Sequence, residues 1–217
     1  WLHLLKCWSL RDSRGASTMH DIRDLCEPTM KAMALETEDT VYLVVRSGFE
    51  AVCMHRWEGS FPIRTLVLEV GSRRPLGVGA GGLAILAAIA EDEREQIIRR
   101  VGPSLPAFGK LTPAALAEAC VTTQAHGVAV IQNRVSLGVT AVGAAFRDSM
   151  GLAIGAVSVA ALSQRMSPTR LRKISDLVLR GARDIEGSLR RQRAPAKAGK
   201  GARVDASVSL AAHGQST

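Results

Sequence analysis

The chain has 217 residues, of which 47% are apolar and only 4% aromatic, and its 28 basic and 20 acidic side chains give a net charge of +8. This length and apolar content predict one globular domain with an aliphatic core, and the run of about 18 uncharged apolar residues that a membrane span requires occurs nowhere. Four scattered cysteines without a CxxC pair and five unclustered histidines argue against a zinc site, so we expect reduced thiols in a cytoplasmic protein with no metal and no cofactor.

The first 19 residues are interpreted as a linker remnant or a leader. Their short apolar patch has no basic lead and no small-residue cleavage site, so we do not interpret it as a signal peptide. An amphipathic helix is predicted next, with an apolar stripe of Ile22, Leu25, Cys26, Met30 and Met33. Pro28 lies within this stretch and would kink the helix or mark its true start.

Three short strands are predicted after this helix. Residues 41–46 and 51–56 are rich in β-branched and apolar side chains and flank a Ser47-Gly48 turn, which indicates a hairpin. Residues 66–70 have the same character and predict a third strand.

The stretch "GSRRPLGVGAGGLAIL", residues 71–86, has four possible interpretations, of which the first is excluded. A Walker phosphate loop is excluded because Gly82 is followed by Leu83 rather than by a lysine and a hydroxyl residue. The glycines at 77, 79 and 82 match the dinucleotide fingerprint by letter, but a charged helix follows where a second strand and an acid are required. The glycines also suit close packing of a helix on a sheet, or a helix N-terminus whose bare amides bind a small anion, and these two roles are compatible.

Three helices are predicted between this loop and residue 127. Residues 80–90 form a run of small apolar side chains and predict a buried helix, and a charged helix follows from residue 91. A third helix has Thr112 as its N-cap, Pro113 at its first position and Gly127 beyond its end.

The second half ends in strands and a long helix. Residues 128–131 predict a strand, and "GVTAVGAAFRDSMGLAIGAVSVAAL" predicts a hairpin that turns at residues 148–151. Ser167 and Pro168 begin a helix with an apolar line of Leu171, Ile174, Val178, Ile185 and Leu189. Strands joined mostly by hairpins, with helices before and after them, predict an α+β domain with an antiparallel sheet.

The positive charge is concentrated at the C-terminal end. From Arg190 onward there are six basic residues and one acid, which gives +5, and the first 189 residues carry the remaining +3. Residues 193–217 are rich in Ala, Gly, Lys and Ser and predict a disordered basic tail. Such a tail can hold nucleic acid loosely through phosphates, but a solubilising terminus is the simpler interpretation.

No catalytic group is predicted, and we expect no enzyme. Cys53 and His55 lie two residues apart on one predicted strand and would face the same side, which an ordinary hairpin face explains. The acidic residues lie mainly on helix surfaces and do not converge.

Several of these motifs occur together in the order of a known family. They are the Arg46-Ser47-Gly48 turn, "RPL" before a small-residue loop and an apolar helix, and the "GVTAV" to "AVSV" hairpin with its D-x-x-G turn. Over residues 20–192 the chain resembles the effector-binding domain of the IclR family of bacterial transcriptional regulators. The resemblance implies a GAF-like fold, which is a curved antiparallel sheet flanked by helices, with a pocket on its concave face.

The resemblance also implies a set of pocket residues. Ala80 and Gly81 would offer backbone amides, Ser158 a hydroxyl, and Arg74 a position near the rim. The apolar lining would come from Ile63, Leu66, Ile131, Ala141 and Ala160. The alternatives are a Ser158 hydroxyl bonded to its own strand, and arginines at 73 and 74 that are simply solvated.

Two departures from the family's pattern bear on the ligand. Residues 131–134 contain no acid where family members often carry one, and Ala141 stands where a polar residue is common. The effector implied is a small carboxylic acid, aliphatic or aromatic and more apolar than glyoxylate or pyruvate, unless the pocket is filled. We expect Gly81→Val to abolish its binding with little loss of fold.

By this resemblance the chain is a ligand-sensing domain that forms a homodimer or tetramer. The winged helix-turn-helix that usually precedes it does not fit into 19 residues, so DNA would be bound only through that missing domain. Two alternatives stay open, which are a nucleotide-binding or catalytic α/β domain that uses residues 77–82, and a stand-alone interaction module with a filled pocket.

Overall fold

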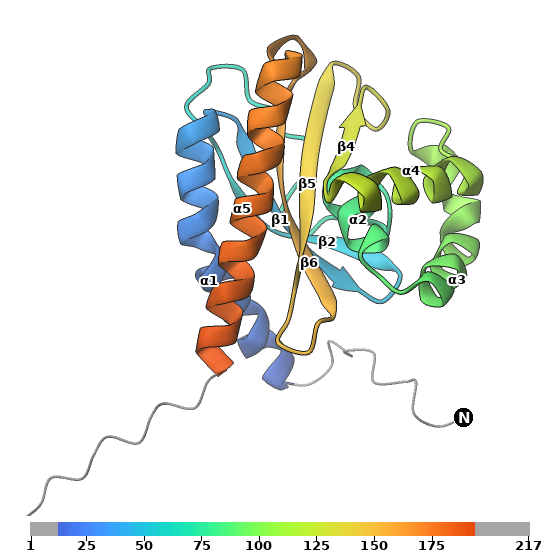
Figure 1. Ribbon diagram of the computed structural model, residues 1–217, viewed down its shortest axis with the longest axis horizontal. Coiled ribbons are helices and arrows are strands. Elements are labelled where there is room, and N and C mark those ends of the chain that lie inside the picture. Colours follow the sequence, from blue (N-terminus) through green and yellow to red (C-terminus); the bar gives the residue numbers. More distant parts are fainter. Residues whose placement is uncertain (1–12, 194–217) are drawn as a thin grey trace, which may run out of the picture.

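A single antiparallel sheet of six strands organises the protein (Figure 1), whose computed structural model describes residues 13–193. The strands lie in the order β3-β2-β1-β6-β5-β4. They are β1 Thr40–Ser47, β2 Glu50–Trp57, β3 Arg73–Pro75, β4 Ala129–Gln132, β5 Val139–Arg147 and β6 Ala153–Leu162. Every strand pair is antiparallel, so the α+β prediction is confirmed and these strands do not form the parallel sheet that a dinucleotide-binding domain requires.

Helices cover both faces of the sheet. α1 Ser13–Thr37 and α5 Pro168–Arg193 pack together on one face, while α2 Gly79–Ala87 lies on the other face and contacts α4 Pro113–His126 (Figure 1). α3 Glu91–Val101 packs beside α4, and 3-10 helices occupy Gly102–Ala107 and Ser163–Arg165.

The alternation of side chains along the strands creates two cores. In β1, Val41, Leu43 and Val45 face α1 and α5, whereas Tyr42 and Val44 face α2. The sheet is therefore buried on both sides, which is why β1 reads as a continuous apolar run rather than an alternating one.

The predicted hairpins and the capping of α4 are confirmed. β1 and β2 join through the turn at residues 48–49, and β5 and β6 join through a turn in which Asp148 Oδ1 accepts the N–H groups of Met150 and Leu152 at 2.8 and 3.0 Å. α4 begins after Thr112, whose hydroxyl accepts the Ala115 N–H at 3.2 Å, and Gly127 ends it in the left-handed region.

Pro28 does not mark the start of α1, contrary to one of the two alternatives. The helix has 25 residues and continues through this position. Pro28 is exposed, so water can bond the Asp24 carbonyl that the missing N–H would otherwise satisfy within the helix.

The prediction of a strand at residues 66–70 is wrong, and the third strand lies at Arg73–Pro75 instead. The reason is a competing set of hydrogen bonds. The Tyr42 hydroxyl donates to the Thr65 carbonyl at 2.6 Å and accepts from the Val67 N–H at 3.0 Å. This backbone is thus bonded to side chains, not to a neighbouring strand.

The prediction that Cys53 and His55 face the same side is also wrong, because β2 contains a β-bulge. His55 lies opposite Leu43 and Cys53 lies opposite Val44, so Met54 is the extra residue. Cys53 consequently belongs to the α2 side of the sheet, and His55 lies on the α1 side. The two side chains form no catalytic pair.

Candidate functional site

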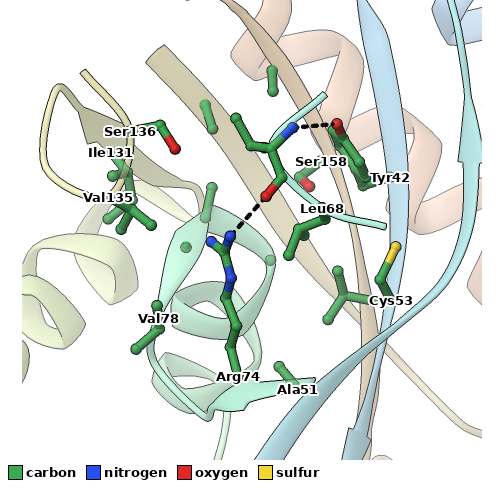
Figure 2. A pocket seen from close by; sticks show the side chains of 18 of the residues that line it. Tyr42, Ala51, Cys53, Leu68, Arg74, Val78, Ile131, Val135, Ser136 and Ser158 are labelled. Carbon is green, nitrogen blue, oxygen red and sulfur yellow. Dashed lines mark hydrogen bonds between the residues drawn. The ribbon is translucent and has the colours of Figure 1, made fainter. Parts of the chain in front are cut away.

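A cavity of about 50 Å³ lies between the sheet and the N-terminus of α2 (Figure 2). One water molecule needs roughly 10–15 Å³ on this scale, so the cavity has the size of a few waters or of one small metabolite. Its walls are mainly aliphatic, from Val44, Ala51, Val67, Leu68, Val78, Ile131, Val135, Val139, Ala141 and Ala160.

Two rows of residues across the sheet form its floor. Ile131, Ala141 and Ala160 are direct partners on β4, β5 and β6. Tyr42 and Ser158 are direct partners on β1 and β6. Since direct partners point to the same face of a sheet, strands far apart in sequence supply one continuous surface.

The N-terminus of α2 supplies the opposite wall. Gly77 and Gly79 adopt φ values of +102° and +76°, which other residues rarely adopt, and these glycines turn the chain into the helix. The N-cap, Val78, has no side-chain acceptor. The amides of the first turn, including those of Ala80 and Gly81 at the cavity, therefore have no cap and carry the positive end of the helix dipole.

Close packing of α2 on the sheet accounts for two further glycines. A Cβ at Gly143 would lie 2.8 Å from the Ala80 carbonyl, and one at Gly81 would lie 3.0 Å from Val44 Cγ2. The packing role and the bare-amide role therefore coexist. Gly81→Val would press on the buried Val44, which corrects the expectation of little loss of fold.

Arg74 places a positive charge at the cavity. It is half-buried on β3, its Nη2 donates to the Val67 carbonyl at 2.6 Å, and its guanidinium carbon lies 6.0 Å from the centre of the Phe108 ring. Burial lowers the pKa of Arg74, while Tyr42 and Cys53 act in the opposite direction. No carboxylate in the described part of the chain forms an ion pair with it.

Arg73 differs from its neighbour. It is exposed and bonds Glu50 at 2.7 Å on the surface. The solvated alternative therefore describes Arg73 and not Arg74.

The remaining polar groups at the cavity are hydroxyls and a thiol. Ser158 is 5% exposed, and its hydroxyl has no partner among residues 13–193, so it is not bonded to its own strand. Tyr42 bonds the backbone of residues 65–67, as described above. Burial raises the pKa of the Cys53 thiol to about 11, while Arg56 lowers it, so the thiol is protonated at neutral pH and is a poor nucleophile.

Seven of the nine predicted ligand-binding residues lie around the cavity, namely Arg74, Ala80, Gly81, Ile131, Ala141, Ser158 and Ala160. Ile63 and Leu66 do not line it and are 61% and 51% exposed. Residues 62–68 lie outside the sheet, and the side chains of Val67 and Leu68 line the cavity instead of those of Ile63 and Leu66. Ligand binding by the seven stays a prediction.

Sequence reasoning missed other cavity residues, including Tyr42, Cys53, Val135 and Ser136. Tyr42 carries a usable signal, because a lone tyrosine within a buried aliphatic strand needs a hydrogen-bond partner for its hydroxyl. Val135 and Ser136 lie in a loop whose pattern has no comparable signal.

The described residues form neither a metal-binding cluster nor a membrane-spanning helix. Among residues 13–193 no three His, Cys, Asp or Glu side chains converge as metal ligands would. The same part of the chain has no helix of the length and apolarity that crossing a membrane demands.

One family of known proteins matches most of this chain. The family described as "Bacterial transcriptional regulator IclR C-terminal" matches residues 15–187. The HTH-type transcriptional repressor AllR of Escherichia coli K12 is 29% identical over 183 residues, which are 81% of this chain and 65% of AllR. The chain thus spans less than two thirds of that relative.

Solved structures share the fold. The IclR protein of Thermotoga maritima has a TM-score of 0.74 at 24% identity, over 81% of this chain and 72% of that protein. An IclR homolog of Microbacterium hydrocarbonoxydans complexed with 4-hydroxybenzoate has a TM-score of 0.68 at 22% identity, over 84% and 72% of the two chains.

Proposed function

Since the chain belongs to the IclR family of bacterial transcriptional regulators and matches its C-terminal domain, we propose that it binds a small carboxylic acid as effector. One observation carries the proposal. The guanidinium of Arg74, which has no carboxylate partner among residues 13–193, and the uncapped amides of Ala80 and Gly81 line the same aliphatic cavity, and no Asp or Glu of the described residues lines it. Together they favour an anion with an apolar body.

The energetics support binding in the micromolar range. A charge-assisted hydrogen bond contributes about 1.5–3 kcal/mol, and the helix dipole adds roughly 0.3–1 kcal/mol. Burial of apolar ligand surface adds about 25 cal/mol per Å². The Ser158 hydroxyl, which has no partner in the described chain, is a further donor to a carboxylate or to a ring substituent.

The ligand class follows from cavity size and wall chemistry. A volume of about 50 Å³ suits a short aliphatic acid, whereas a single-ring aromatic acid requires a wall of the cavity to move outward. The 4-hydroxybenzoate bound to the Microbacterium homolog supports the aromatic choice for this chain.

The regulatory role rests on the family. We propose that effector binding here controls DNA binding by a helix-turn-helix domain outside this chain, as the names of HTH-type relatives suggest, in the cytoplasm and without catalysis. The homodimer or tetramer expected from the resemblance is part of the proposal, and light scattering that gives a monomer at all concentrations would count against it.

The proposed effector class is tested by calorimetry with glyoxylate, pyruvate, benzoate and 4-hydroxybenzoate. Benzamide is the matched control, because it has the shape of benzoate without its charge. We expect at least one acid to bind with a micromolar Kd and benzamide to bind at least tenfold more weakly than benzoate. Equal binding of benzoate and benzamide, or no binding of any acid, would overturn the proposal.

Ala141→Asp is expected to weaken acid binding by about 100-fold, because it places a like charge at the cavity wall. Gln132→Asp adds the same charge at the exposed end of the neighbouring strand β4 and should change the Kd less than threefold. Similar losses in both variants would show that the effect is long-range and that the acid does not lie beside Ala141.

A further inference from the structure

Residues 62–68, which we call the strap, cross the cavity outside the sheet. Val67 and Leu68 of the strap line the cavity, and Thr65 is buried. Ile63 and Leu66 point to solvent. The strap is thus one wall of the cavity on its inner side and protein surface on its outer side.

Side chains supply the hydrogen bonds that hold the strap backbone, and Val67 and Leu68 also pack against the core. The Tyr42 hydroxyl bonds both Thr65 and Val67, and Arg74 donates to the Val67 carbonyl, so two side chains clamp one residue from two sides (Figure 2). Arg56 Nη1 donates to the Leu68 carbonyl at 3.2 Å. Outside helices and strands, the backbone hydrogen bonds of the described chain include none from residues 62–68.

Both ends of the strap are fixed. The Phe61 N–H donates to the Glu38 carbonyl at 3.0 Å, and the Gly71 N–H donates to the Cys53 carbonyl at 2.8 Å. A segment that is anchored at its ends and held by a few side-chain bonds between them can open locally while the sheet stays intact.

We propose that the strap opens and closes over the cavity, with Tyr42 as the positioning residue that latches it. Breaking the two bonds of one hydroxyl frees the Thr65 carbonyl and the Val67 N–H together, and leaves only the bonds from Arg74 and Arg56 to be broken. The cavity wall then swings away, and a path from solvent to Cys53, Ser158 and the α2 amides opens.

Arg74 links the strap to the effector, a step that rests on the proposed function. A guanidinium has five N–H donors, and one of those on Arg74 bonds the strap. The others are available to a carboxylate, so a bound acid and the closed strap share one fixed guanidinium. By linkage, the acid stabilises the closed strap and the closed strap slows release of the acid.

The latch is tested in the ligand-free protein through three buried thiols. Cys53 lines the cavity, whereas Cys26 lies on the buried face of α1 and Cys120 on the buried face of α4, and each is at most 1% exposed. We expect Tyr42→Phe to speed N-ethylmaleimide labelling of Cys53 by about tenfold at fixed pH, followed by peptide mass spectrometry. Labelling of Cys26 and Cys120 should not change.

Arg74→Met is the second variant, with a matched control. It should also speed Cys53 labelling. The Arg74 charge lowers the pKa of Cys53, so its loss leaves less reactive thiolate and acts in the opposite direction. Arg73→Met removes a guanidinium that does not reach the strap, and this control should not change the rate.

The outcomes separate the two proposals. Faster labelling of Cys53 alone in Tyr42→Phe supports the latch. If Tyr42→Phe instead speeds labelling of all three buried thiols, the result with Arg74→Met decides. The latch is overturned if the rate of Cys53 labelling is unchanged in both variants. It is also overturned if both variants speed labelling of the three buried thiols by the same factor. In wild type, whichever of the four acids binds by calorimetry should slow hydrogen exchange of the strap peptide. Binding without slower exchange overturns the link to Arg74, and absence of binding by all four acids counts against the proposed function alone.

Discussion

Arg74→Met is expected to weaken binding of benzoate or 4-hydroxybenzoate by about 10- to 100-fold. The guanidinium is half-buried and has no carboxylate partner in residues 13–193, so it is free to bond the acid directly. One charge-assisted bond at about 1.5–3 kcal/mol accounts for a loss of this size. Methionine keeps an unbranched apolar side chain beside Phe108, so the loss combines the missing bond to the acid with the missing bond to the Val67 carbonyl. Calorimetry gives the Kd.

Two further variants make this test specific. Arg73→Met removes the same charge one residue earlier, where the side chain bonds Glu50 at the surface, and should leave the Kd within threefold of wild type. Arg74→Lys keeps the charge but loses the planar donor geometry, and should give an intermediate Kd. If Arg73→Met and Arg74→Met weaken binding equally, the acid responds to net charge and Arg74 does not contact it.

Asp39→Ala is expected to lower the free energy of unfolding by about 3 kcal/mol. The Asp39 side chain is 4% exposed, with Arg170 Nη2 at 2.8 Å and Arg165 Nε at 3.4 Å from its oxygens. Removal of one partner from a buried ion pair typically costs about 3–5 kcal/mol, and the partial exposure of both arginines places this case at the lower end. Urea unfolding followed by circular dichroism measures the loss.

The position of Asp39 explains the size of this effect. It lies just after α1, and its two arginines come from the 3-10 helix at residues 163–165 and from the first turn of α5. Arg165 also stacks on the Phe61 ring, with its guanidinium carbon 3.4 Å from the ring centre. Alanine would leave two neighbouring cations without their shared carboxylate and would loosen the junction of α1 with α5.

Glu36→Ala is the matched control for Asp39→Ala. Glu36 and Arg180 also join α1 to α5, but at 3.8 Å and with both side chains more than half exposed. An exposed pair of this kind contributes about 0–1 kcal/mol. Equal destabilisation by the two substitutions would contradict the view that burial makes the Asp39 pairs important.

The sequence alone determined the features that depend on neighbouring residues. The N-cap at Thr112, the left-handed Gly127 and the Asp148 turn are set within a few residues of chain, and all three are confirmed. The order of family motifs also placed Arg74, Ala80, Gly81 and Ser158 at one site, and these residues line one cavity.

Only the tertiary structure decided the features that depend on distant partners. The bulge at Met54 arises from register with β1, and it sends Cys53 and His55 to opposite faces although their spacing predicts the same face. The strap has residues that favour a strand, yet Tyr42, about 25 positions earlier in the chain, takes its hydrogen bonds. Local preference sets which conformations a segment can adopt, but its backbone must bond whichever groups the fold brings within reach, and those groups lie outside the segment's own sequence.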